Sequence, residues 1–128
     1  MRRARRVDVW IEDGVIVIDA AFQDSASTRD GNGQRAALHE YNLSATADPQ
    51  TMRLLSIDAT PRVLPFPECP GAVANLPRLI GSDLSAMRQT VLDELPGTLG
   101  CTHLNDALRS LAEVPALVRY LRQSIEAA

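Results

Sequence analysis

Two cysteines and two histidines supply every thiol and imidazole of this chain, and they are Cys69, Cys101, His39 and His103. The tetrapeptide Gly100-Cys101-Thr102-His103 is the most informative of these sites, because the glycine allows a tight turn just before a predicted helix. Unpaired N–H groups and the positive end of the helix dipole favour a thiolate at such a position. A thiolate is the form that both metal binding and nucleophilic attack require.

Each of these residues also has a purely structural interpretation. A free cysteine often packs in the core as a small apolar residue, and the cytoplasmic location that we expect disfavours a Cys69–Cys101 disulfide. His39 lies on an apolar strand face, where a histidine is commonly part of the core. The carboxylates Glu40 and Asp58 are candidates for acid or base catalysis beside Cys101 as a nucleophile, with solvated strand positions as the alternative.

The first half of the chain has the two-residue period of β-strands. Val7–Ile11 alternates apolar and polar residues, and Asp13-Gly14 predicts a tight turn into a returning strand over Val15–Phe22. Gln23–Arg35 is polar and rich in glycine, which is typical of a loop. A second hairpin is predicted from Ala36 to Ala59.

The second half of the chain has the period of helices. An irregular, proline-rich arm at 61–70 leads to this half, because Pro61, Pro65 and Pro67 disfavour regular structure. Helices are predicted over Gly71–Ile80, from an N-cap at Ser82 to about Leu95, from Thr102, and from Pro115. We therefore predict one domain over residues 1–128 of the α+β class, with antiparallel hairpins within 7–60 packed under a C-terminal helical layer within 71–126.

Composition excludes several classes of function. The chain has 128 residues, a net charge of −3 and 45% hydrophobic residues, which is typical of one soluble domain. No apolar run reaches the roughly 18–20 residues of a membrane span. Lysine is absent, so a Schiff base to pyridoxal phosphate and a nucleotide-binding P-loop are excluded. The net negative charge argues against binding to nucleic acid. The basic cluster Arg2–Arg6 is interpreted as a flexible terminus.

Two resemblances follow from the order of these motifs. The stretch from His39 to Leu104, with Pro67, Cys69, Gly81 and the Gly-Cys-Thr-His-Leu motif, resembles an uncharacterised bacterial family known only as a domain of unknown function. The hairpin, Asp58-Ala59, Cys69 and Cys101-Thr102-His103-Leu104 are also similar, in that order, to the NifU/IscU iron–sulfur scaffold family. This second resemblance implies a NifU/IscU-like fold.

The NifU/IscU resemblance also implies a set of site residues. Cys69 and Cys101 match the second and third cysteines of that family, and His39 falls where the family has a ligand-loop aspartate. The chain departs from the pattern at Ala37, which replaces the first cysteine, and at Gly100, which replaces a histidine. The Pro-Pro-Val-Lys chaperone-binding sequence of the family is absent. The resemblance therefore leaves His39, Cys69 and Cys101 as candidate metal ligands.

Two thiolates and one imidazole suit Zn²⁺, and three protein ligands would leave a fourth position open for water or substrate. His103, Asp58 or Glu40 could instead close the coordination shell. A [2Fe–2S] cluster needs four ligands, so an iron–sulfur cluster would require an outside donor, and zinc is placed ahead of it. Two alternatives to a metal-binding function stay open.

The first alternative is a metal-free enzyme that uses Cys101, Glu40 or Asp58 on a small acyl or aromatic compound in bacterial catabolism or secondary metabolism. The second is a non-catalytic subunit that binds a partner protein. The sequence identifies neither the small molecule nor the partner, and it leaves homo-oligomerisation and a native N-terminus open.

Overall fold

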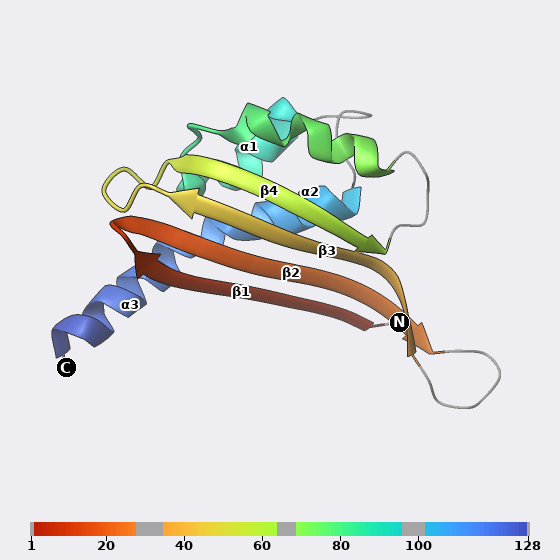
Figure 1. The fold of residues 1–128 in the computed structure, drawn as a ribbon, viewed down its shortest axis with the longest axis horizontal. Coiled ribbons are helices and arrows are strands. Elements are labelled where there is room, and N and C mark those ends of the chain that lie inside the picture. Colours follow the sequence, from red (N-terminus) through yellow and green to blue (C-terminus); the bar gives the residue numbers. More distant parts are fainter. Residues whose placement is uncertain (1, 28–34, 64–68, 96–101, 128) are drawn as a thin grey trace.

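The computed structural model describes residues 2–27, 35–63, 69–95 and 102–127 (Figure 1). Four antiparallel strands form one sheet in the order β1-β2-β3-β4. The strands are β1 (Arg2–Glu12), β2 (Val15–Ser27), β3 (Arg35–Ala47) and β4 (Leu54–Val63). The first hairpin predicted from the sequence corresponds to β1–β2, and the second corresponds to β3–β4.

Helical segments follow the strands and pack against one face of the sheet (Figure 1). They are η1 (Cys69–Leu79), η2 (Leu84–Ala86), α1 (Met87–Glu94), α2 (Thr102–Arg109), η4 (Ser110–Glu113) and α3 (Val114–Ala127), where η denotes a 3₁₀ helix. The predicted α+β class, with antiparallel strands followed by a C-terminal helical layer, is therefore confirmed. None of the helices in the described ranges has the length and apolar character needed to cross a bilayer.

The β1–β2 hairpin is closed by the predicted Asp-Gly turn. Asp13 and Gly14 have φ angles of 51° and 77°, and Glu12 pairs directly with Val15 across them. Two consecutive residues with positive φ form a type I′ turn, whose twist matches that of the strands on either side. This turn fixes the register of the whole hairpin.

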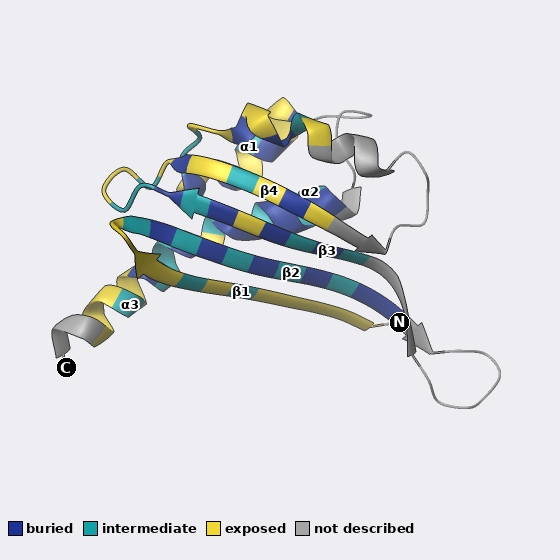
Figure 2. Cartoon of the chain, in the orientation of Figure 1, coloured by how far each residue is buried: buried dark blue, intermediate teal, exposed yellow. Residues whose placement is uncertain are grey.

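The two faces of the sheet differ in burial, as Figure 2 shows. Alternate residues of β2 and β3 are buried under the helices, on what we call the covered face, because successive strand residues point to opposite sides. The residues between them lie on the other side, which we call the open face. No described helix or strand packs on the open face.

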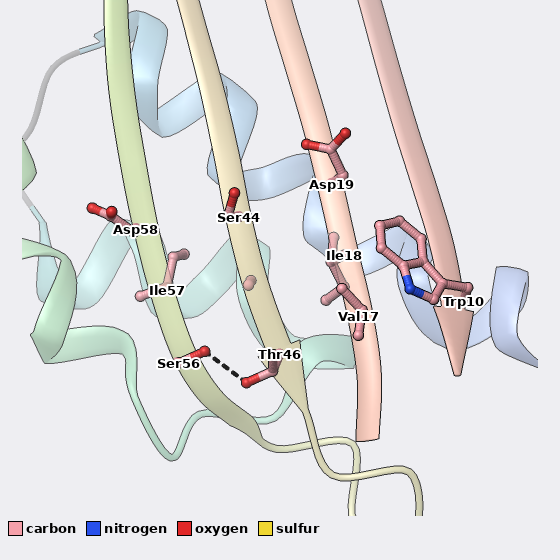
Figure 3. Close-up of a pocket in the computed structure, with 10 residues that line it drawn as sticks. Trp10, Val17, Ile18, Asp19, Ser44, Thr46, Ser56, Ile57 and Asp58 are labelled. Atoms are coloured by element: carbon pink, nitrogen blue, oxygen red, sulfur yellow. Dashed lines mark hydrogen bonds between the residues drawn. The ribbon is translucent and has the colours of Figure 1, made fainter. Parts of the chain in front are cut away.

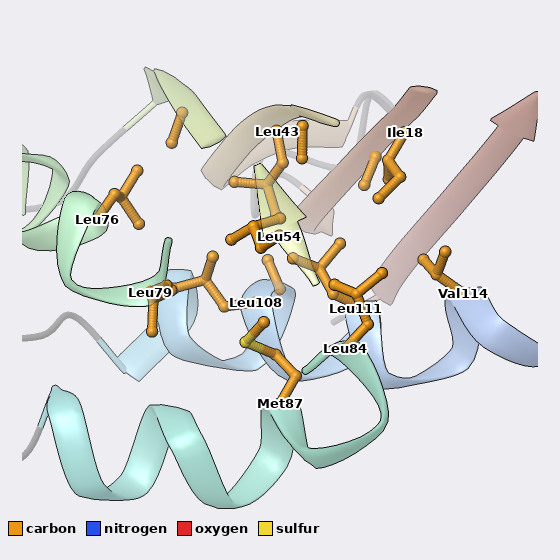
Figure 4. Close-up of a cluster of buried hydrophobic side chains, with 14 of the residues drawn as sticks. Ile18, Leu43, Leu54, Leu76, Leu79, Leu84, Met87, Leu108, Leu111 and Val114 are labelled. Atoms are coloured by element: carbon orange, nitrogen blue, oxygen red, sulfur yellow. The ribbon is translucent and has the colours of Figure 1, made fainter. Parts of the chain in front are cut away.

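The core fills the space between the covered face and the helices (Figure 4). Sheet residues such as Ile18 and Leu43 meet Leu84, Met87 and other helix residues that are fully buried. The remaining members labelled in Figure 4 are Leu54, Leu76, Leu79, Leu108, Leu111 and Val114. This continuous apolar layer holds the helices to the sheet.

The segment between η1 and η2 is hydrogen-bonded to the start of β4. Gly81 N–H donates to the Leu54 carbonyl (2.8 Å), and Leu54 N–H donates to the Ser82 carbonyl (2.9 Å). Gly81 has a φ of 88°, which suits glycine at the end of a helix. Asp83, and not the predicted Ser82, is the N-cap, since its carboxylate accepts from Ser85 N–H at 2.9 Å.

Several predicted boundaries were wrong. The basic cluster is not a flexible terminus, because β1 begins at Arg2 and pairs with β2 over its full length. The predicted loop Gln23–Arg35 begins and ends in strands, since β2 continues to Ser27 and β3 starts at Arg35, and its residues 28–34 lie outside the described residues. Pro61 lies within β4 at the edge of the sheet, where a missing N–H is tolerated. Pro65 and Pro67 lie outside the described residues.

Candidate functional site

The structure does not describe the side chains of the cysteines and histidines that the sequence analysis identified as candidates. Cys101 lies outside the described residues, and so do the side chains of His39, Cys69 and His103. Elsewhere in the described chain, no group of three or more His, Cys, Asp or Glu side chains is arranged to hold a metal ion. The structure does show which elements carry these residues.

The three elements that carry or directly follow the predicted ligands, β3, η1 and α2, meet at one end of the sheet. His39 is followed by Glu40, and Glu40 pairs with Val63, the last residue of β4. The helix η1 begins at Cys69, six positions after that strand end, and packs against β4. In Figure 1, η1 and α2 both begin at this end of the sheet.

An ion-pair cluster joins α2 to the strand position of His39. In the sheet register, Arg3 of β1 lies opposite Asp24 of β2, and Asp24 lies opposite His39 of β3. The Arg3 guanidinium donates to both oxygens of Asp24, from Nε to Oδ1 at 2.8 Å and from Nη2 to Oδ2 at 3.1 Å. Its Nη1 donates to Oδ2 of Asp106 in α2 at 3.4 Å. The middle of α2 is therefore tied, through Asp106, to the Arg3–Asp24–His39 row.

The Asp24 side chain is fully buried, whereas that of Arg3 keeps 42% of its surface exposed. A buried carboxylate requires such a partner, since an isolated charge is costly to remove from water. The Arg3 guanidinium also lies over the Phe22 ring, 4.9 Å from its centroid, and that of Arg5 lies 5.9 Å from the same ring. The hydrogen bond to Asp24 is the main reason why the pKa of Arg3 is raised.

This ion-pair cluster was missed by the sequence analysis. The composition of Arg2–Arg6 predicts a flexible terminus and that of Gln23–Arg35 predicts a loop, so neither segment alone indicates that Arg3 and Asp24 pair across two strands. The signal was present in the register, because extending the hairpin outward from Asp13-Gly14 brings residues 3 and 24 opposite each other. Asp24 lies two residues after Phe22 in β2, so its side chain points to the same covered face, and Arg3 lies opposite it in β1.

Asn105 adds a polar atom near the start of α2. Its Nδ2 donates to the Leu95 carbonyl at 3.3 Å. Its Oδ1 is buried and has no hydrogen-bond partner among the described residues. The Asn105 Oδ1 atom, about one turn after the start of α2, is therefore a hydrogen-bond acceptor without a donor among the described residues.

The candidate carboxylates Glu40 and Asp58 lie on the open face, away from α2. Glu40 pairs with Gln23, and Asp58 pairs with Ser44. Asp58 and Ser44 line a shallow pocket with Asp19 (Figure 3), together with Trp10, Val17, Ile18, Ala45, Thr46, Ser56 and Ile57. Catalysis by these carboxylates would take place on the opposite side of the sheet from α2.

Arg6 forms ion pairs on the open face, close to this pocket. Arg6 donates to Asp8 of its own strand and to Oδ2 of Asp19 at 3.2 Å. Hydrogen bonds to Asp8 and then to Asp19 raise the pKa of Arg6. Trp10 Nε1 donates to Oε2 of Glu12 at 3.1 Å. The pocket beside them thus has an acidic and aromatic rim.

Comparison with protein families gives one match. Residues 1–117 match the family described as Protein of unknown function (DUF2889), which covers the sheet, η1, α1, α2 and the start of α3. No curated protein and no solved structure matches the chain.

Proposed function

We propose that this chain, which belongs to the DUF2889 family of unknown function, is a small metal-binding module whose site is formed by His39, Cys69 and Cys101. The observation that carries the proposal is the Arg3–Asp24–His39 row. It places the strand position of His39 beside Asp24, to which Arg3 ties Asp106 of α2. Cys101 immediately precedes that helix.

The chemistry of the donor set supports the same site. Helix α2 has eight residues and begins at Thr102, so its N-terminal N–H groups and dipole favour the thiolate form of the preceding cysteine. Cys69 opens η1 at the end of the sheet where β4 finishes. Two thiolates and one imidazole form a set that Zn²⁺ binds tetrahedrally.

The fourth position is assigned to His103 or to a water or substrate. Glu40 and Asp58, which were also candidates to close the shell, lie on the open face and are separated from α2 by the sheet. A site with an open position could polarise a small substrate, whereas closure by His103 would make it structural. An iron–sulfur cluster, with an outside fourth ligand, is the less favoured occupant.

The test measures the metal content of the complete chain, purified without a histidine tag from medium that contains zinc and iron. We expect about one equivalent of zinc and no visible absorbance from an iron–sulfur cluster. Cys69→Ser and Cys101→Ser should each lower the zinc content at least tenfold. Asp58→Asn is the matched control, because it changes a polar group on the open face, and it should retain the metal.

A zinc and iron content below about a tenth of an equivalent in the folded wild-type chain would reject the proposal. Iodoacetamide labelling then addresses the metal-free enzyme. A Cys101 that reacts at neutral pH much faster than an ordinary thiol would favour a nucleophilic role for that residue.

A further inference from the structure

The outer edge of β1 has no paired strand among the described residues. β1 is the first strand in the sheet order, and within the part of the chain that the structure describes it pairs with β2 alone. All of its residues are exposed except Val7 and Val9, which are half-buried. The helix α3 contacts β1 and leaves it exposed to this extent. A long exposed edge is a ready template for another strand.

The hairpin turn determines which backbone groups point outward from this edge. A two-residue loop is closed by a pair of residues that hydrogen-bond to each other, here Glu12 and Val15. Hydrogen bonding alternates along an antiparallel pair, so the even-numbered residues of β1 bond to β2. The N–H and C=O groups of the odd-numbered residues therefore face outward, and these are Arg3, Arg5, Val7, Val9 and Ile11.

We propose that two copies of this chain associate through β1, antiparallel and symmetric about Val7, to form one continuous eight-stranded sheet. Val7 is the central residue of β1 and one of those with outward backbone groups. A twofold axis beside it would make Val7 of each copy exchange two hydrogen bonds with Val7 of the other. Arg5 would pair in the same way with Val9 of the second copy, and Arg3 with Ile11.

The side chains of β1 are self-complementary in this register. Residues whose numbers add up to 14 become neighbours, which brings Arg6 opposite Asp8 of the second copy and Arg2 opposite Glu12. These are the closely spaced pairs that do not share hydrogen bonds, and their side chains lie nearest each other. All four residues share the parity of the open face. Because the axis repeats each pair, the dimer contains four cross-strand pairs of opposite charge.

Charge on an edge strand more often prevents association, since like charges repel an incoming strand. In β1, however, the arginines are concentrated in the first half and the acidic residues in the second. An antiparallel copy therefore meets opposite charge, whereas a parallel copy would place arginine against arginine. The pattern favours one partner, the same strand in the opposite direction.

A charge-exchange experiment tests this register in the complete chain. Sedimentation velocity of the wild type should show a species of about twice 13.9 kDa whose population falls on dilution. Arg6→Asp and Asp8→Arg should each raise the dissociation constant about tenfold or more, because each places like charges opposite each other twice. An equimolar mixture of the two variants should restore the dimer, since one chain is then acidic at both positions and the other is basic at both.

A second pair of variants tests the backbone contact. Val7→Pro removes an outward N–H that β2 does not use, so it should abolish the dimer while circular dichroism shows a folded chain. Val7→Thr keeps the N–H and should remain dimeric.

A wild type that stays monomeric at the highest soluble concentration would overturn the proposal. A dimer that persists in Val7→Pro, or a mixture of Arg6→Asp and Asp8→Arg that remains monomeric, would overturn it as well.

Discussion

Replacing Arg3 by methionine tests whether the Arg3–Asp24–Asp106 cluster holds the sheet to α2. Methionine keeps an unbranched apolar side chain over Phe22 and removes the guanidinium. The fully buried carboxylate of Asp24 then loses both hydrogen bonds from Arg3, of 2.8 and 3.1 Å. Arg5→Met is the matched control, because Arg5 lies over the same ring at 5.9 Å.

The expected magnitude follows from the burial of the two partners. Removing one partner of a buried ion pair costs about 3–5 kcal/mol, and one hydrogen bond to a charged group contributes about 1.5–3 kcal/mol. The Arg3 side chain is 42% exposed, so solvent screening reduces the effect. We expect Arg3→Met to lower the free energy of unfolding by about 2–3 kcal/mol. Arg5→Met should cost no more than about 1 kcal/mol, the size of an exposed cation–π contact.

Urea denaturation followed by circular dichroism measures both values, with equal slopes expected for the two variants. The midpoint of thermal unfolding should fall by roughly 6–12 °C in Arg3→Met. If the two variants lose the same free energy within about 0.5 kcal/mol, the carboxylate bonds contribute nothing beyond the ring contact. The assigned role of Asp24 would then be wrong.

Four further substitutions, one of them a control, have defined outcomes. Leu84→Ala should lower the free energy of unfolding, measured by urea denaturation, by about 2–5 kcal/mol because Leu84 is fully buried. Leu92→Ala is the control, and because Leu92 is 57% exposed it should lower the same free energy by less than about 0.5 kcal/mol. Bonds from the Ser85 hydroxyl and N–H lower the pKa of Asp83, so its ionised form stabilises the fold above the unfolded value of 3.8. Asp83→Ala should therefore cost about 1 kcal/mol at neutral pH, and a cost that does not shrink as the pH is lowered below about 4 would contradict the cap. Gly14→Ala should destabilise by about 1 kcal/mol through its φ of 77° alone, since no atom lies within 4 Å of the added methyl; an unchanged thermal midpoint would refute this.

Local patterns in the sequence were sufficient for the class of fold. The Asp13-Gly14 turn and the alternation around Val7–Ile11 and Ala36–Ala59 are signals of strand pairing that need no distant partner. The apolar period after residue 71 likewise predicts a helical layer. These signals agree with one another, so the order of strands and helices could be derived from them.

The errors occurred where pairing overrode composition. Arg2–Arg6 is basic and Gln23–Ser27 is polar, and each alone has the composition of a terminus or a loop. Together they extend one hairpin, because backbone bonds, the Arg3–Asp24 pair and burial beside Phe22 offset the weak strand propensity. Such a gain exists only once the two segments are opposite each other, so it is not visible in either segment alone.

The candidate site was predicted only in part for a similar reason. Helix starts near Cys69 and Cys101 follow from turn residues and caps, and the structure has helices starting at Cys69 and Thr102. The relation of α2 to the His39 row depends on Arg3 and Asp106, which are 103 positions apart. No local pattern contains that information. The three-residue metal site itself stays a prediction.

The contact between α3 and β1 has a consequence for synthesis of the protein. The strands leave the ribosome before the helical segments do, and the covered face of the nascent sheet is then open to water and to other chains. Arg122 of α3 donates to the Pro49 carbonyl at 2.8 Å, 73 positions earlier in the chain. Val114 and Val118 of α3 are buried members of the core, so the core is complete only when the last described helix has emerged. A translation pause before Val114 would leave the part of the core beside β1 exposed to water.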